Sequence, residues 1–166
     1  MNNIEQVPKS PETIQFRIIE IKKINYVRND YLQFGYGLND IINGEVKIGV
    51  KLELEPNHET FSIFLNMEYV KEENLLFGVE SLHKYHIINF KNALKFQDNG
   101  QYQVNDEVMK LWLQVAINDT RGMLVILNSD HEYSKIIFPL IDLNAFIQSL
   151  KGNKSEDVKQ SDPEIK

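Results

Sequence analysis

Apolar and polar residues alternate most regularly in the middle of the chain. Over residues 45–55 every second position is apolar and the intervening positions are mostly charged, which is typical of a half-buried antiparallel β-strand. The apolar positions are Val46, Ile48, Val50, Leu52 and Leu54. A turn-forming stretch at 56–59 follows, and the alternation resumes over 61–69. Two strands joined by so short a turn predict a β-hairpin.

Two further strands are expected on either side of this hairpin. Residues 14–27 form an extended apolar pattern whose phase shifts between Ile18 and Ile19, and a β-bulge would explain that shift. The aromatic and turn-rich stretch 28–43 then predicts a crossover loop. A run over 75–90 predicts the fourth strand.

The period changes from two to 3.6 in the last third of the chain. An apolar stripe with helical spacing predicts a long amphipathic helix, formed by Val108, Leu111, Trp112, Val115 and Ala116. Asn105 or Asp106 can cap its start. Gly122 falls within the pattern and predicts either a kink or close approach of another backbone, and the sequence leaves both possibilities open.

A short helix capped by Asp142 should follow, with an apolar stripe of Leu143, Phe146, Ile147 and Leu150. The predicted fold is therefore α+β, a four-stranded antiparallel sheet followed by a long and a short C-terminal helix packed on one face. We expect one domain over 14–150, a flexible lead over 1–13, and a disordered polar tail over 151–166 that has almost no apolar residues.

Composition restricts the function further. The chain of 166 residues has a net charge of -6, which argues against a nucleic-acid partner because such binding depends on clustered Lys and Arg. The absence of cysteine excludes disulfides, thiolate nucleophiles and Cys-ligated zinc. Neither a signal peptide nor an apolar run of about 20 residues is present, so we expect a cytoplasmic protein without membrane insertion.

The sequence contains little that indicates catalysis. Its four histidines are His58, His83, His86 and His131. His83 and His86 should lie on opposite faces of a strand, which makes a metal site improbable on spacing. The Asp-His-Glu run at 130–132 is best interpreted as a solvated loop, and no nucleophile or phosphate-binding motif occurs. We therefore expect no enzyme activity, no cofactor and no metal.

The order of four strands, a crossover after the first, a long helix and a short helix resembles the SecB family of export chaperones. The residues that carry the resemblance are 16–24 (FRIIEIKKI), 45–48 (EVKI), 120–122 (TRG) and 138–146 (FPLIDLNAF). Together they span roughly 14–150. The chain departs from the family pattern in residues 91–104, which are extra, and in a tail without a recognisable translocase-docking end.

This resemblance implies an ATP-independent holdase that binds unfolded or precursor polypeptides, for protein export or for toxin–antitoxin control. It also implies a homo-oligomer, a tetramer built as a dimer of dimers, and as possible partners the translocase ATPase or a toxin–antitoxin pair. The expected client groove is lined by Phe34, Tyr36, Leu38, Phe146, Ile147 and Leu150. The expected oligomer interface contains Trp112, Val115, Asp119, Gly122 and Met123.

Alternatives stay open at this point. The aromatic residues of the crossover can either pack under the sheet or line the groove, because exposure cannot be derived from sequence. A small thioester-acting enzyme with a hotdog fold is a rival function, although that fold places its main helix among the early strands. A dedicated interaction module with a single partner is the third possibility.

Overall fold

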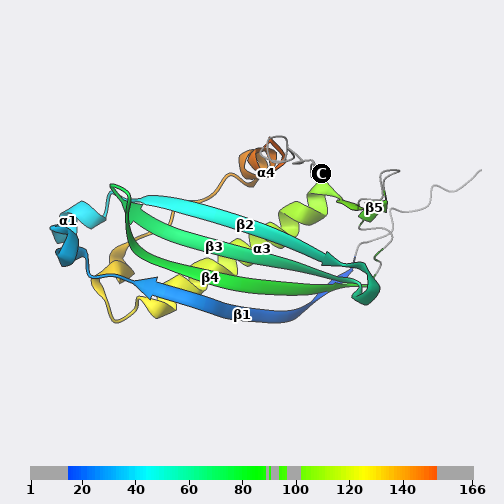
Figure 1. Cartoon of the computed structure of the whole chain (residues 1–166), viewed down its shortest axis with the longest axis horizontal. Coiled ribbons are helices and arrows are strands. Elements are labelled where there is room, and N and C mark those ends of the chain that lie inside the picture. The colour runs from blue at the N-terminus through cyan, green and yellow to red at the C-terminus, as the bar shows by residue number, and fades with distance from the viewer. Residues whose placement is uncertain (1–14, 89, 91–93, 97–101, 153–166) are drawn as a thin grey trace, which may run out of the picture.

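A computed structural model describes residues 15–88, 90, 94–96 and 102–152 of the chain. Within that part the chain is α+β, with one open sheet and a long and a short helix after it (Figure 1). The predicted flexible lead lies outside the described residues. The predicted tail lies outside them from residue 153 onward, and its first two residues belong to the last helix.

Four antiparallel strands form the sheet in the order β1-β4-β3-β2. Their bounds are β1 Phe16–Arg28, β2 Glu45–Glu55, β3 Thr60–Lys71 and β4 Asn74–Ile87. The crossover from β1 leads to the opposite edge of the sheet, so β1 and β2 are its two edge strands. This confirms the predicted hairpin, the crossover and the fourth strand.

The remaining elements connect or cover the sheet. The crossover contains a 3₁₀ helix at Tyr31–Phe34 and α1 at Leu38–Ile41, and a second 3₁₀ helix at Pro56–His58 makes the β2–β3 turn. The long helix α3 is Asp106–Leu127 and the short helix α4 is Leu143–Gly152. The unexpected elements are the small strands β5 Leu94–Phe96 and β6 Tyr102–Val104, which pair with each other, and a 3₁₀ helix at Glu132–Lys135.

Strand β1 carries the predicted bulge. The register with β4 shifts between Ile18 and Glu20, so Ile19 is the additional residue, and a second shift between Lys23 and Asn25 makes Ile24 another. Each bulge reverses which side of the sheet the following residues face. The apolar residues of β1 are consequently divided between both faces.

Helix α3 begins as its sequence predicts. Asn105 is the N-cap and accepts a 2.9 Å hydrogen bond from the backbone N–H of Glu107. The helix continues through Gly122 to Leu127, and a Cβ at Gly122 would meet no atom within 4 Å. Among the described residues, therefore, no other backbone approaches Gly122 closely. No helix in the described part of the chain is long and apolar enough to cross a bilayer.

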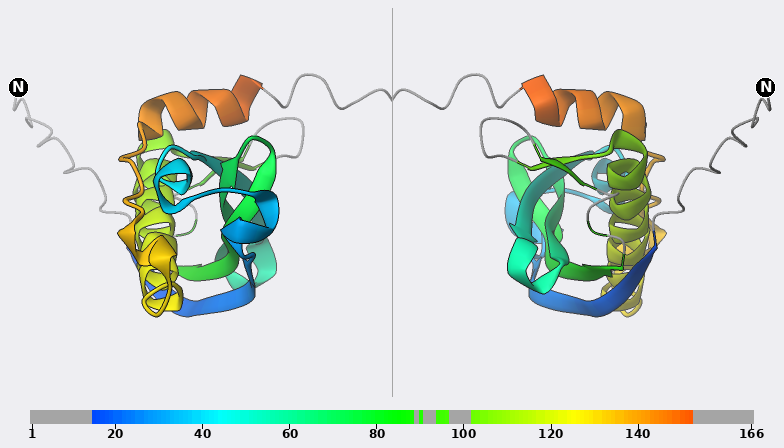
Figure 2. Two further views of the ribbon diagram at one scale, coloured as in Figure 1. Left: turned by 90° about the vertical axis from the view of Figure 1, so that its left-hand side faces the viewer. Right: turned by 90° about the vertical axis from the view of Figure 1, so that its right-hand side faces the viewer.

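One helix covers only part of one sheet face. Helix α3 packs mainly against β3 and β4 on one side of the sheet (Figure 2). The inward side chains of these two strands are almost fully buried. Trp112 lies at the centre of this contact with no exposed surface, stacked on Tyr85 at 5.8 Å between ring centroids and 4.7 Å from the ring of Phe61. The outer strands β1 and β2 receive much less cover from the helix.

Replacing Trp112 by Ala should lower the free energy of unfolding by about 3–5 kcal/mol, because a large ring is removed from a packed core. Urea denaturation at constant protein concentration measures this loss. Gln114→Ala, at an exposed position of the same helix, is the control and should stay within about 0.5 kcal/mol of wild type. Equal effects of the two substitutions would contradict the placement of Trp112.

Candidate functional site

The inward apolar residues of β2 form a row that α3 leaves half-covered. This β2 row consists of Val46, Ile48, Val50, Leu52 and Leu54, all partly buried and packed against the core. Their register partners on β3 are almost completely buried, with Leu65 and Met67 at 0 % exposure. The sequence pattern predicts which way the row faces, but the missing cover depends on where α3 crosses the sheet.

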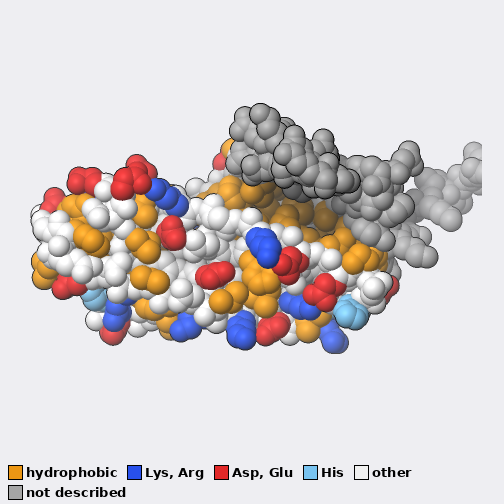
Figure 3. All heavy atoms as spheres, in the orientation of Figure 1, with side chains coloured by type: hydrophobic (Ala, Val, Ile, Leu, Met, Phe, Trp, Pro, Cys, Tyr) orange, Lys and Arg blue, Asp and Glu red, His pale blue; other side chains and the backbone are white. Residues whose placement is uncertain are grey.

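Helix α4 lies at the β2 side of the molecule and contacts α3 (Figures 1 and 2). Asp142 caps it as predicted, because its carboxylate accepts hydrogen bonds from the backbone N–H groups of Asn144 (2.9 Å) and Ala145 (3.1 Å). Of the predicted groove residues here, Ile147 is buried, whereas Phe146 and Leu150 are half-buried against the core. Hydrophobic side chains gather along this edge of the molecule (Figure 3).

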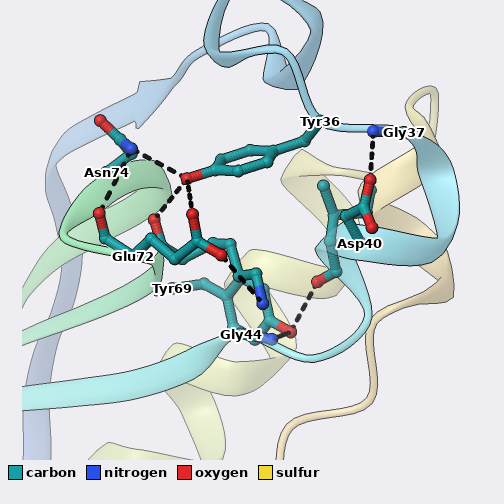
Figure 4. Close-up of polar contacts among 9 residues, drawn as sticks. Tyr36, Gly37, Asp40, Gly44, Tyr69, Glu72 and Asn74 are labelled. Carbon is teal, nitrogen blue, oxygen red and sulfur yellow. Dashed lines mark hydrogen bonds and ion pairs between the residues drawn. The ribbon is translucent and has the colours of Figure 1, made fainter.

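The crossover is fastened to the β3–β4 turn by one tyrosine. The hydroxyl of Tyr36 donates to the backbone carbonyl of Lys71 at 3.1 Å and accepts from the side-chain amide of Asn74 at 2.9 Å (Figure 4). Phe34 and Leu38 are half-buried against the core, as is Tyr36. All three side chains therefore pack against the core while part of each stays open to solvent, and a role in a client groove stays a prediction.

A second tyrosine fixes the end of the crossover. The hydroxyl of Tyr69 accepts from the backbone N–H of Gly44 at 2.8 Å and lies 2.8 Å from the carbonyl oxygen of Ile41 (Figure 4). A Cβ at Gly44 would lie 2.5 Å from the Tyr69 ring and 2.7 Å from the carbonyl oxygen of Val70, so only glycine fits. Burial raises the pKa of Tyr69 and keeps this hydroxyl protonated.

The predicted oligomer interface is only partly at the surface. Trp112 belongs to the core, so its assignment to an interface is wrong: its side chain packs on the sheet of its own chain. Val115, Asp119 and Met123 are half-buried and Gly122 is exposed.

The outer side of α3 exposes apolar residues that the sequence analysis did not single out. Val125 is 63 % and Ile126 74 % exposed, and Leu111 is also exposed. The segment between α3 and α4, which runs along α3, exposes Ile137 and Leu140 at 88 % each (Figure 2). On the β1 edge Ile18, Ile19, Ile21 and Ile24 are exposed as well. Leu111 belongs to the predicted helical stripe and Ile126 is in phase with it, whereas Val125 is not, so the spacing alone does not separate the buried side of α3 from its exposed side.

The face of the sheet opposite α3 is mixed in character. A shallow hollow of about 520 Å³ crosses it, lined by Ile24, Gly49, Val50, Lys51, Phe64, Asn66 and Glu80. The ammonium group of Lys51 lies 5.4 Å from the centroid of the Phe64 ring, a cation–π distance. Charged residues of both signs surround the hollow, as on an ordinary solvated sheet face.

A serine, a histidine and an aspartate do converge, although no motif predicted it. The Oγ of Ser81 lies 3.0 Å from Nε2 of His83, whose Nδ1 lies 3.8 Å from a carboxylate oxygen of Asp119. Hydrolytic triads use this order of groups, but they need an open nucleophile and an oxyanion hole. Ser81 and His83 are both 0 % exposed, so a substrate cannot reach the serine in this structure.

The other histidines have ordinary surface roles. His58 pairs with Glu55 at 3.2 Å, and His86 lies 3.8 Å from Glu59. His131 accepts from the backbone N–H of Tyr133 at 3.3 Å and so begins a 3₁₀ helix. Among the residues that the structure describes, no three His, Asp or Glu side chains come together as metal ligands would.

The run 130–132 is a charged loop whose charges are paired. Asp130 forms an ion pair with Arg28 at 2.7 Å, and this contact lowers the pKa of the Asp130 carboxyl. Glu132 pairs with Lys135. These three residues interact with separate partners and do not surround a common site.

Comparisons with known proteins add no family. No protein-family model matches the chain, and no curated protein matches it. The arguments about function therefore rest on the fold and on the exposed apolar residues.

Replacing Tyr36 by Phe should loosen the crossover, because the carbonyl of Lys71 and the amide of Asn74 lose their partner. We expect a loss of about 1 kcal/mol in the free energy of unfolding, with faster hydrogen exchange concentrated in residues 31–43. Tyr31→Phe in the same crossover is the control and should leave exchange there near wild type. If hydrogen exchange became faster by the same factor along the whole chain, Tyr36 would not be fastening the crossover in particular.

Proposed function

We propose that the protein is an ATP-independent holdase that binds unfolded polypeptides, as the resemblance to SecB implies. The observation that carries this proposal is the half-covered β2 row beside α4. An apolar row that a protein's own helix leaves open is a suitable surface for an extended apolar segment. Such binding requires no catalytic group, no cofactor and no metal.

The β2 row fits an extended client by geometry. β2 is an edge strand, so one side of its backbone has no ladder partner within the sheet. A client strand could pair there and place every second side chain beside Phe146 and Leu150 of α4. Burial of apolar surface stabilises such a complex by roughly 25 cal/mol per Å², so a long contact compensates for low specificity.

The crossover supplies a second contact region at one end of the sheet. Leu32 and Ile42 are exposed there, next to the half-buried Phe34, Tyr36 and Leu38. Because Tyr36 and Tyr69 fasten the crossover, this region can bind a client without first being ordered, which lowers the entropic cost of binding. The net charge of -6 favours clients with basic segments.

Self-association belongs to the same proposal. The exposed isoleucines of β1 and the outer side of α3, with Leu111, Val125 and Ile126, form apolar surfaces that one subunit leaves uncovered. A homo-oligomer, with a dimer of dimers as its expected form, would bury them. Gly122 and the half-buried Val115, Asp119 and Met123 lie on or beside that side of α3.

Among the alternatives, the holdase agrees best with the element order. The long helix follows all four strands, whereas a hotdog enzyme places its main helix among the early strands. A module with one dedicated partner would use the same surfaces, and its binding range separates it from a holdase. A cytoplasmic role in export or in toxin–antitoxin control, with the translocase ATPase or a toxin–antitoxin pair as partner, is part of this proposal.

The double variant Ile48→Thr, Val50→Thr should bind a denatured polypeptide about tenfold more weakly than wild type. It replaces apolar surface of the β2 row by hydroxyls of similar shape and keeps β-branched residues in the strand. Affinity for a fluorescently labelled unfolded protein and suppression of its aggregation measure the effect.

The matched control is Lys47→Thr, Lys51→Thr, which changes the other face of the same strand. It should leave the affinity within about twofold of wild type. Equal losses in both variants, or no loss in either, would reject the β2 row as the client site. Binding of a single native protein and of no denatured one would support the dedicated module.

Replacing Val125 and Ile126 together by Glu should dissociate the oligomer, because charged side chains would have to be buried in the interface. Light scattering should show a mass several times that of the chain for wild type and a smaller mass for the variant. Gln148→Glu, at an exposed position of α4, should keep the wild-type mass. A wild-type protein that is a monomer at micromolar concentration would contradict the assembly.

A further inference from the structure

A cluster of four polar side chains joins the middle of β4 to the middle of α3. Ser81 and His83 come from the strand, Asp119 and Thr120 from the helix, and Ser81, His83 and Thr120 have no exposed surface. Ser81 Oγ lies 2.8 Å from Thr120 Oγ1, and His83 Nε2 lies 3.1 Å from the same atom. Elsewhere the contact between α3 and the sheet is largely apolar.

The position of Asp119 favours one of the two nitrogens of His83 as the site of the proton. Thr120 donates its hydroxyl to the backbone carbonyl of Ala116 at 2.7 Å, whereas the hydroxyl of Ser81 can donate to Nε2 at 3.0 Å. Nδ1 is buried without a hydrogen-bond partner and faces the carboxylate of Asp119 at 3.8 Å. A bare lone pair there would be repelled by the carboxylate, which favours the proton on Nδ1.

A second proton would disturb this arrangement. Nε2 would become a donor, and the Ser81 hydroxyl that donates to it would have to turn away, toward Thr120 Oγ1 at 2.8 Å or the carbonyl of Leu65 at 3.4 Å. The imidazolium would also be buried, with a single carboxylate at 3.8 Å to balance its charge. An ion pair at that separation, with the imidazolium fully buried and Asp119 half-buried, does not repay the loss of hydration of the imidazolium.

We propose that this cluster is a proton-sensitive clasp, in which neutral His83 holds α3 against the sheet and protonation of His83 releases it. The release would uncover the apolar sides of β3 and β4 that α3 covers. The inference does not depend on holdase activity, since it concerns the contact between one helix and one sheet.

Few other charges face His83. Its register partners are Ile21 on β1 and Ile63 on β3, both apolar. The carboxylate of Asp119 comes from α3, and Tyr85, two residues along β4, is a phenol whose pKa burial raises. Lys23 on β1 is the register partner of Ser81 and is exposed. Asp119 is therefore the charge that acts on His83 most directly.

The pH range of the clasp follows from the direction of the pKa shift. Burial lowers the pKa of His83 below its ordinary value of 6.5, and this effect outweighs the opposite influence of Asp119. The released state then binds a proton more readily than the docked state. Docking is complete above pH 6.5 and weakens as the pH falls toward the pKa of the docked state, by about tenfold for each pH unit.

Two measurements on the wild-type protein test the clasp. NMR titration of the imidazole should give His83 a pKa below 6.5. Hydrogen exchange, corrected for the intrinsic effect of pH, should show protection in α3 falling by up to about tenfold per pH unit between pH 6.5 and that pKa, before β3 loses protection. A pKa of 6.5 or above, or simultaneous loss in α3 and β3, would overturn the proposal.

Variants assign the effect to the named residues. In His83→Gln, an uncharged amide replaces the imidazole, so α3 protection should no longer depend on pH. His86→Gln, at a partly exposed position of the same strand, should keep the wild-type dependence. Asp119→Asn removes the carboxylate that raises the pKa of His83, so the weakening should extend to lower pH.

If α3 protection in His83→Gln still falls with pH as steeply as in wild type, His83 is not the responsible group. Should that variant fail to fold, the wild-type NMR titration and the comparison of α3 with β3 decide the question by themselves. If α3 protection in Asp119→Asn depends on pH as in wild type, and His83 keeps its wild-type pKa, Asp119 does not belong to the clasp.

Discussion

The packing of one helix on four strands is the constraint on which the structure depends. An α-helix is about 10–12 Å wide with its side chains, whereas neighbouring strands lie about 4.8 Å apart. A single helix therefore covers two or three strands. Here α3 covers β3 and β4, so the edge strands β1 and β2 have apolar residues without a complete cover. The surfaces assigned to clients and to self-association both result from this incomplete cover of the edge strands by α3.

The crossover has a related role because it spans the end of the sheet to connect the two edge strands. Its aromatic residues are half-buried, and two tyrosine hydroxyls fix its path through main-chain contacts near Lys71 and Gly44. Main-chain partners tolerate changes in the neighbouring side chains. The crossover can therefore present different exposed residues, such as Leu32 and Ile42, on one fixed backbone path.

Sequence patterns predicted the elements well and their burial less well. Alternation and helical spacing identified the four strands, both long and short helices, the bulge after Ile18 and the caps at Asn105 and Asp142. Pattern cannot show how far a helix reaches across a sheet, so Trp112 was misassigned and the β2 row was missed. The contact of His83 with Asp119 joins residues far apart in the chain, and local spacing carries no information about it.

The two bulges in β1 have a consequence for how its free edge behaves. A straight, regular edge offers the same hydrogen-bonding pattern at every two-residue step, and any similar strand can add to it without limit. Ile19 and Ile24 interrupt that pattern at two fixed points. A pairing strand must match both interruptions, which restricts the number of acceptable alignments. Fibril growth from this edge is thereby discouraged, despite the exposed isoleucines that it carries.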